Sequence, residues 1–187
     1  MRWDIPNILT VFRIILIPVF VVVFFWPEFQ DKHVLLTSIF FVAGISDWFD
    51  GYLARKLEQQ SAFGAFLDPV ADKLMVGVAF VCLVSAHPGA LMAVPAVIII
   101  GREIAISGLR EWMANRGQDG VVAVNMGGKV KTAAQMLSIG FLLYYQDLWH
   151  MPVKEIGYSL LYLAAILTLW SMVRYLISAW PTLVSED

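Results

Sequence analysis

Four aspartates in an otherwise apolar region are the residues most capable of chemistry. Asp47 and Asp50 lie three residues apart, and Asp68 and Asp72 lie four apart. In a helix, either spacing puts both carboxylates on one face, about one turn apart. The polar stretch at residues 58–61 separates the pairs, so we expect two antiparallel neighbouring helices joined by a tight turn. The sequence therefore predicts four carboxylates that meet at one end of a helical pair, here called the acidic cup.

The acidic cup needs positive charge, because close anions in a low dielectric repel one another strongly. Arg55 and Lys73 are near enough in sequence to neutralise two of the charges. Divalent cations fit better, since carboxylates without a nearby histidine or thiol suit Mg²⁺, Mn²⁺ or Ca²⁺. The alternative is a solvated loop with surface ion pairs. It is disfavoured because apolar residues such as Phe49, Leu53 and Val70 lie between the acids, and acids in membrane segments are usually functional.

Small residues share this region with the acids. Gly51, Ala54 and Gly64 would let a flat or phosphorylated ligand approach the backbone. Small residues also serve close helix packing, which is the better explanation of each glycine when it is taken alone.

Composition indicates an all-helical integral membrane protein. Of the 187 residues, 59% are hydrophobic and only 15% are charged, and the net charge of −2 implies no nucleic-acid partner. The single Cys82 excludes an internal disulfide. We predict one domain, 1–187, with six transmembrane helices and a short N-terminal interfacial helix opened by Asp4 and Pro6. The apolar runs are 8–26, 34–45, 74–86, 91–100, 133–145 and 156–177, and the first is expected to remain as a span rather than be cleaved.

Basic residues predict the orientation. The connections near 27–33, 86–90 and 146–154 hold only Lys32 and Lys154. The other eleven bases lie on or near the opposite side: Arg2, Arg13, Arg55, Lys56, Lys73, Arg102, Arg110, Arg116, Lys129, Lys131 and Arg174. The positive-inside tendency makes that side cytoplasmic, with both termini inside. His33, His87 and His150 then lie at outer turns, where we expect interface residues rather than catalysts.

The spacing of the acids and small residues resembles the signature of the CDP-alcohol phosphotransferases. Its eight fixed positions are all present: Asp47, Asp50, Gly51, Ala54, Arg55, Gly64, Asp68 and Asp72. The stretches DIPNILTVFR at 4–13, GREIAISGLREW at 101–112 and GKVKTAAQM at 128–136 are similar to bacterial members that use glycerol 3-phosphate. The resemblance covers nearly the whole chain.

The resemblance implies transfer of a substituted phosphate from a CDP-alcohol, here CDP-diacylglycerol, to a hydroxyl group with release of CMP. It implies Mg²⁺ or Mn²⁺, two ions, on Asp47, Asp50, Asp68 and Asp72, with Asp72 also the general base. Residues implied for the donor are Asn7, Thr10, Asp50, Gly51, Ala54, Arg55 and Gly64, and Arg13 shares a face with Asn7 and Thr10. It further implies a homodimer in the bacterial inner membrane, with the active site cytoplasmic.

An anionic acceptor such as glycerol 3-phosphate would need a basic pocket. Arg102 and Arg110 are eight residues apart and share a helix face, whereas Lys129 and Lys131 do not, and of these two we favour Lys129. The alternative for these bases is anchoring at the membrane surface or contact with lipid headgroups. Glu103 and Glu111 would orient the bases or form salt bridges with them.

Three rival functions remain open from sequence. The same chemistry with another acceptor, such as inositol phosphate or serine, would keep the acidic cup and change the basic pocket. A divalent-cation transporter would also use intramembrane acids, but these would be spread through the bilayer depth. A lipid-binding scaffold would leave Asp72 without a role.

Overall fold

The computed structural model describes residues 5–57, 62–116 and 126–184, and within the helices it describes no side chains for 5–7, 48, 50–57, 62–63, 65–66, 68 and 126–129. The described chain is helical apart from short turns and one isolated bridge between Leu148 and Met151. The helices are α1 (Ile5–Phe25), α2 (Lys32–Leu57), α3 (Ala62–Ala86), α4 (Ala90–Asn115), α5 (Met126–Tyr144) and α6 (Val153–Val184).

Four of these helices are long and apolar enough to cross a membrane. The candidate spans are Ile8–Phe25, Pro69–Ala86, Ala90–Asn115 and Val153–Val184, in α1, α3, α4 and α6. The prediction of six spans is therefore corrected to four within the described residues. Charged residues at the two ends of α2 lower its apolarity, and α5 has only 19 residues and begins with a glycine- and lysine-containing turn.

The predicted interfacial helix is not a separate element in the described chain. Instead, α1 runs from Ile5 to Phe25 without a break. Pro6 lies in the first turn, where a helix needs no N–H donor, and so it starts this long helix rather than ending a short one.

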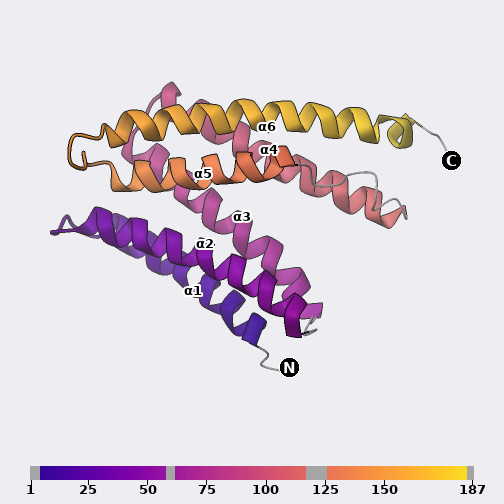
Figure 1. Ribbon diagram of the computed structural model, residues 1–187, viewed down its shortest axis with the longest axis horizontal. Helices are drawn as coiled ribbons and strands as arrows, with labels where there is room; N and C mark the ends of the chain where they lie inside the picture. The colour runs from indigo at the N-terminus through magenta and orange to yellow at the C-terminus, as the bar shows by residue number, and fades with distance from the viewer. Residues whose placement is uncertain (1–4, 58–61, 117–125, 185–187) are drawn as a thin grey trace.

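The helices form two antiparallel pairs, α1 with α2 and α5 with α6. Helix α3 lies between the pairs, and α4 lies beside them. In Figure 1, α1 lies along α2, α5 lies along α6, and α3 crosses between the two pairs. The α2–α5 contact depends on small residues, because a Cβ at Gly140 would lie 2.5 Å from the ring of Phe41. Helix α4 packs against both α3 and α6. In this arrangement α3 contacts α1, α4 and α5.

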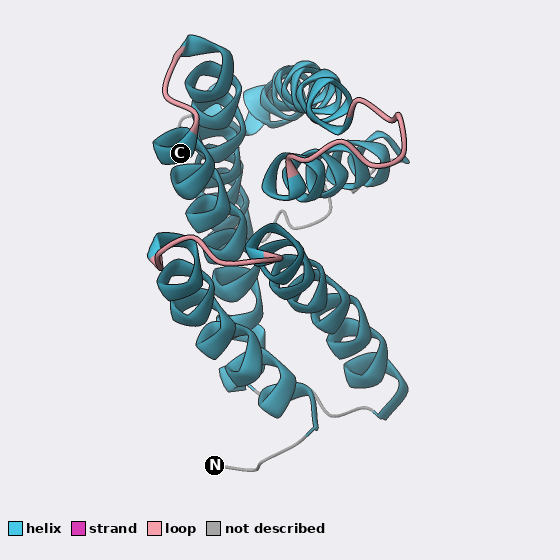
Figure 2. Cartoon of the chain, turned by 90° about the vertical axis from the view of Figure 1, so that its left-hand side faces the viewer, coloured by secondary structure: helices cyan, strands magenta, loops and turns pink. Residues whose placement is uncertain are grey.

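The short turns gather at one end of the bundle, where Figure 2 shows them facing the viewer. The His33 ring lies 4.9 Å from that of Tyr144, and the His87 ring stacks on Tyr145 at 4.2 Å. Burial and then the charge of Lys154 lower the pKa of His87, so its ring is neutral near pH 7. His33 at the start of α2 and His87 after α3 thus both contact the end of α5. Their predicted place at the membrane interface stays a prediction.

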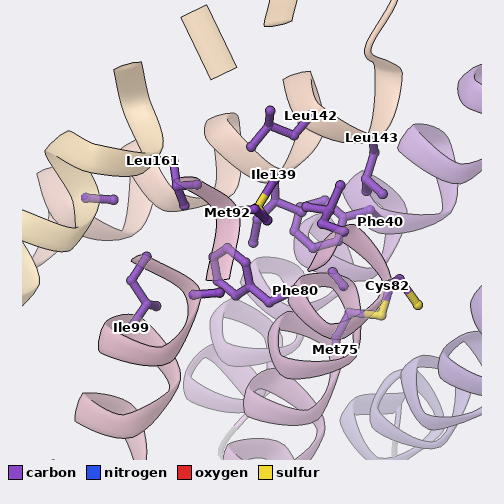
Figure 3. Packing of buried hydrophobic residues seen from close by; sticks show 14 of the residues in the cluster. Phe40, Met75, Phe80, Cys82, Met92, Ile99, Ile139, Leu142, Leu143 and Leu161 are labelled. Carbon is purple, nitrogen blue, oxygen red and sulfur yellow. The ribbon is translucent and has the colours of Figure 1, made fainter. Parts of the chain in front are cut away.

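One apolar core connects all six described helices. Figure 3 shows Phe40 of α2, Phe80 of α3, Ile99 of α4, Ile139 of α5 and Leu161 of α6 converging on it. Many other large apolar side chains point outward, with Val97 70% exposed and Ile177 67% exposed. Outward apolar faces on long helices are typical of lipid contact, because the hydrocarbon solvates them. Together with the four candidate spans, they identify a multi-pass membrane protein.

Candidate functional site

A cavity of about 840 Å³ lies among α1, α3, α4, α5 and α6. Its two ends differ in chemistry. Polar residues at one end are Asp72, Lys73, Arg102, Glu103, Arg110, Lys131, Thr132, Gln135 and Tyr175. Apolar residues line the rest, among them Val21, Phe25, Val78 and Val81. A cavity of this size can hold a charged group at one end and hydrocarbon at the other.

Of the predicted acidic cup, Asp72 is the member whose described side chain lines this cavity. It lies near the start of the α3 span, and its carboxylate is within electrostatic reach of Asp47, Glu103, Arg13 and Lys73. Among the described residues, it has no side-chain hydrogen bond. Its oxygens are therefore open to a ligand in the cavity.

Asp47 is held by a residue for which we had predicted a different role. Its Oδ1 accepts a hydrogen bond from Arg13 Nη1 at 2.6 Å, and Arg13 is only 2% exposed on α1. From the sequence, Arg55 and Lys73 were candidates to neutralise two of the acids, although divalent cations fitted better. Lys73 lines the cavity, and the side chain of Arg55 lies outside those described. The signal for Arg13 was available in the sequence. A lone cation inside an apolar run needs an anionic partner.

The complete acidic cup stays a prediction. The side chains of Asp50 and Asp68 lie outside those described, so the structure places only Asp47 and Asp72. Among the residues it does describe, no three His, Cys, Asp or Glu side chains form a group that could hold a metal ion.

The opposite wall carries a basic cluster, defined as Arg102, Arg110 and Lys131. Arg102 is 8% exposed, and its Nη1 donates to Glu103 Oε1 at 2.9 Å. Lys131 Nζ donates to the same oxygen at 2.7 Å, so one carboxylate joins α4 to α5. Arg102 Nη2 lies 3.4 Å from Ser171 Oγ on α6. Three helices thus fix two buried cations at the cavity wall.

Arg110 joins the cluster through α6. Its Nη2 donates to the Tyr175 hydroxyl at 3.1 Å. The guanidinium carbons of Arg110 and Arg102 both lie 5.4 Å from the centre of the Tyr175 ring. Arginine over an aromatic ring at this distance is a cation–π contact. The predicted common face of Arg102 and Arg110 on α4 is consistent with this arrangement.

The other predicted site residues have varied placements. Lys131 lines the cavity, while the side chain of Lys129, which we had favoured, lies outside those described. Thr10 and Gly64 are buried but do not line the cavity, and Glu111 is exposed away from it. The side chains of Asn7, Gly51 and Ala54 lie outside those described as well.

Sequence reasoning missed Ser171 and Tyr175, which complete the basic wall from α6. Their signal was weak. Both residues carry a hydroxyl group. They are four apart in an otherwise apolar segment, and so they lie on one helix face.

The chain is similar to known proteins over nearly its whole length. Residues 3–170 match the family model described as CDP-alcohol phosphatidyltransferase. A CDP-diacylglycerol–glycerol-3-phosphate 3-phosphatidyltransferase of Haemophilus influenzae is 52% identical over 177 residues, which cover 94% of this chain and 93% of the relative. Proteins of the same name from Salmonella typhimurium and Shigella flexneri are 48% and 47% identical over 186 residues, with 100% of each chain covered.

Proposed function

Since the chain belongs to the CDP-alcohol phosphatidyltransferase family, we propose that it transfers the phosphatidyl group of CDP-diacylglycerol to sn-glycerol 3-phosphate. The products are phosphatidylglycerophosphate and CMP. The observation that carries this proposal is the sequence identity with relatives named for this reaction, which is 52% and 48% over nearly the whole chain. The cavity supports it, because one wall is acidic, the other is basic and the far end is apolar.

The donor would occupy the cavity along α3. Its acyl chains suit the apolar end formed by residues such as Val78 and Val81, where burial of hydrocarbon is favourable. Its cytidine diphosphate would then lie toward the acids, near Asn7, Thr10, Arg55 and the small residues of the signature.

Asp72 would act as the general base. A glycerol hydroxyl is a poor nucleophile, and a carboxylate within hydrogen-bond reach can accept its proton in the transition state. The hydroxyl oxygen then forms a bond to the phosphorus that bears diacylglycerol. The bond from that phosphorus to the bridging oxygen breaks, and the electron pair leaves with CMP. Asp72 supports this role by its position at the cavity, with oxygens free of hydrogen bonds from described side chains.

The acidic residues have the donor chemistry for two Mg²⁺ or Mn²⁺ ions. Asp47, Asp50, Asp68 and Asp72 would hold them, since hard oxygen ligands suit these cations. When bound, the metal offsets the negative charge of the diphosphate. Arg13 on α1 would keep the Asp47 carboxylate directed toward α1 rather than toward solvent.

The basic cluster would bind the phosphate of the acceptor. Arg102 Nε is buried and has no hydrogen-bond partner in the described structure, so it retains a donor for an anion. Arg102, Lys131 and Arg110 carry three positive charges, and Glu103 removes one. The net charge of +2 matches a phosphomonoester, which carries roughly −1.5 to −2 at neutral pH. Lys129 would add to this pocket if it turns inward.

The membrane arrangement completes the proposal. The outer turns joined by His33 and His87 carry few bases, whereas the site lies toward the basic ends of α3 and α4. By the positive-inside tendency, the active site and both termini would be cytoplasmic, in a bacterial inner membrane. A homodimer would cover part of the outward apolar surface, and chemical cross-linking in native membranes tests it.

The deciding experiment measures CMP release by the purified protein with CDP-diacylglycerol, Mg²⁺ and one acceptor at a time. Release with glycerol 3-phosphate and a phosphatidylglycerophosphate product are expected. Release only with inositol phosphate or another alcohol would keep the chemistry and overturn the acceptor. Metal uptake into liposomes without CMP release would favour a transporter, and neither activity in folded protein would favour a scaffold.

A further inference from the structure

We infer that Tyr175 is a positioning residue that holds Arg102 and Arg110 together for the acceptor phosphate. This inference rests on the proposed function, because it gives that function a residue that sets specificity for a phosphorylated acceptor. Tyr175 follows the last residue of the family match, which ends at 170. The inference is carried by contacts in the structure.

Tyr175 contacts both arginines of the basic cluster. Its hydroxyl accepts from Arg110 Nη2 at 3.1 Å, and its ring lies 5.4 Å from each guanidinium carbon. Tyr175 also lines the cavity beside them. The two cations therefore share one neutral partner at the wall where an anion would bind.

The two arginines need such a partner for an electrostatic reason. Like charges near one aromatic ring repel each other when no anion is present. Arg102 is also held by Glu103 and Ser171, but Arg110 is exposed and has a long side chain with many rotamers. Without Tyr175, Arg110 would spread into solvent, and phosphate binding would have to bring it back. Holding it in place beforehand lowers that cost.

The position of Tyr175 on α6 is itself fixed. The buried face of α6 includes Leu161, Ala164, Thr168 and Ala179. Tyr175 lies seven residues after Thr168 and four before Ala179, which puts it on the same face. It is half-buried, so packing restrains its ring while one edge faces the cavity.

A positioning role makes a specific kinetic prediction. Loss of Tyr175 should raise the KM for glycerol 3-phosphate while the KM for CDP-diacylglycerol and kcat stay near their original values. The hydroxyl and the ring make separable contributions. Tyr175→Phe removes only the hydrogen bond, and we expect about a threefold rise in acceptor KM. Tyr175→Leu removes both contacts, and we expect a rise of about tenfold or more.

The experiment compares Tyr175→Phe and Tyr175→Leu with wild type in full-length purified protein. Acceptor KM, donor KM and kcat are measured, together with inhibition by inorganic phosphate, which probes the anion pocket without a glycerol group. The inhibition constant for phosphate should rise in parallel with the acceptor KM. The matched control is Tyr162→Leu on the same helix, because Tyr162 is 38% exposed and does not line the cavity. This control should change none of these values.

The outcomes separate this inference from the function on which it rests. Wild-type protein that releases no CMP with glycerol 3-phosphate would overturn the proposed function. Wild-type activity with unchanged acceptor KM and phosphate inhibition in both Tyr175 variants would overturn only the role of Tyr175. Equal loss of kcat and of donor affinity would also overturn it, since that pattern indicates general disruption. If Tyr175→Leu does not fold, the graded effect of Tyr175→Phe decides.

Discussion

The acidic and basic sides of the cavity are built in different ways. On the basic side, Arg102 and Lys131 are buried and share the Glu103 carboxylate at 2.9 and 2.7 Å, with Ser171 and Tyr175 beside them. On the acidic side, Asp47 has Arg13 at 2.6 Å, whereas Asp72 has no hydrogen bond from a described side chain. The cations of the basic wall are held in a fixed network by protein groups, whereas the acidic wall leaves an acid open.

This difference indicates what each wall requires from its ligands. A network whose cations are held by shared partners can keep a rigid shape before an anion arrives, so it is suited to recognition. A carboxylate left near other carboxylates carries an electrostatic cost that a cation or a proton can relieve. The acidic wall is therefore suited to metal binding and proton transfer. Four predictions test this contrast.

The largest effect is expected for Asp72→Asn. The amide keeps the shape of the side chain but cannot accept the hydroxyl proton, and general bases contribute on the order of 10²–10⁴ to rate. We expect CMP release to fall by that range, while binding of CDP-diacylglycerol is largely retained. A single-turnover assay and a donor-binding assay on the same preparation measure the two quantities. Asp147→Asn, in the connection between α5 and α6, is the control and should be fully active. Full activity of Asp72→Asn would end the assignment of the base.

Metal dependence tests the acidic wall from a second direction. Chelation should abolish activity, and added Mg²⁺ or Mn²⁺ should restore it. In Asp47→Asn, one ligand charge is lost, and the Mg²⁺ concentration for half-maximal rate should rise by about tenfold or more. Titration of activity against Mg²⁺ gives this value. Activity that survives chelation would show that the acids serve another purpose.

The basic wall should respond in its acceptor kinetics alone. Arg102→Gln removes a buried charged donor, so we expect the glycerol 3-phosphate KM to rise by about 30- to 100-fold. Arg110→Gln removes a more exposed one, and we expect about tenfold. Donor KM should stay constant in both. Arg116→Gln, at the C-cap of the same helix and outside the cavity lining, serves as the control. An unchanged acceptor KM in both variants would favour an uncharged acceptor.

The sequence predicted the two walls unequally. Asp47 and Asp72 were found because helical spacing and an apolar setting are local properties of the chain. The common face of Arg102 and Arg110 was also a local inference. The choice between Lys129 and Lys131 could not be made from local properties, since it depends on how α5 is rotated against α4. The pairing of Lys131 with Glu103 spans 28 residues, and no periodicity within either helix fixes it.

The same reason explains the errors in the membrane part of the prediction. Apolar runs located the helices, but whether α2 and α5 count as spans also depends on the charged residues near their ends. Arg13, Ser171 and Tyr175 were missed as partners because each acts on a residue in another helix. Pairing between distant helices is a property of packing rather than of local pattern.

The smallest effect concerns stability, and it distinguishes the walls most directly. Glu103→Gln leaves Arg102 and Lys131 buried without their shared anion, so the free energy of unfolding should fall by about 1–3 kcal/mol. Asp72→Asn removes a charge that is repelled by Asp47 and Glu103, so in the absence of metal it should leave stability unchanged or raise it. Unfolding midpoints in detergent, with chelator present, compare the two variants. If Asp72→Asn were the more destabilising, the acidic wall would already be satisfied by the protein, and the contrast between the walls would be wrong. If added Mg²⁺ stabilises wild type more than Asp72→Asn, the open carboxylate is where cation binding contributes to stability.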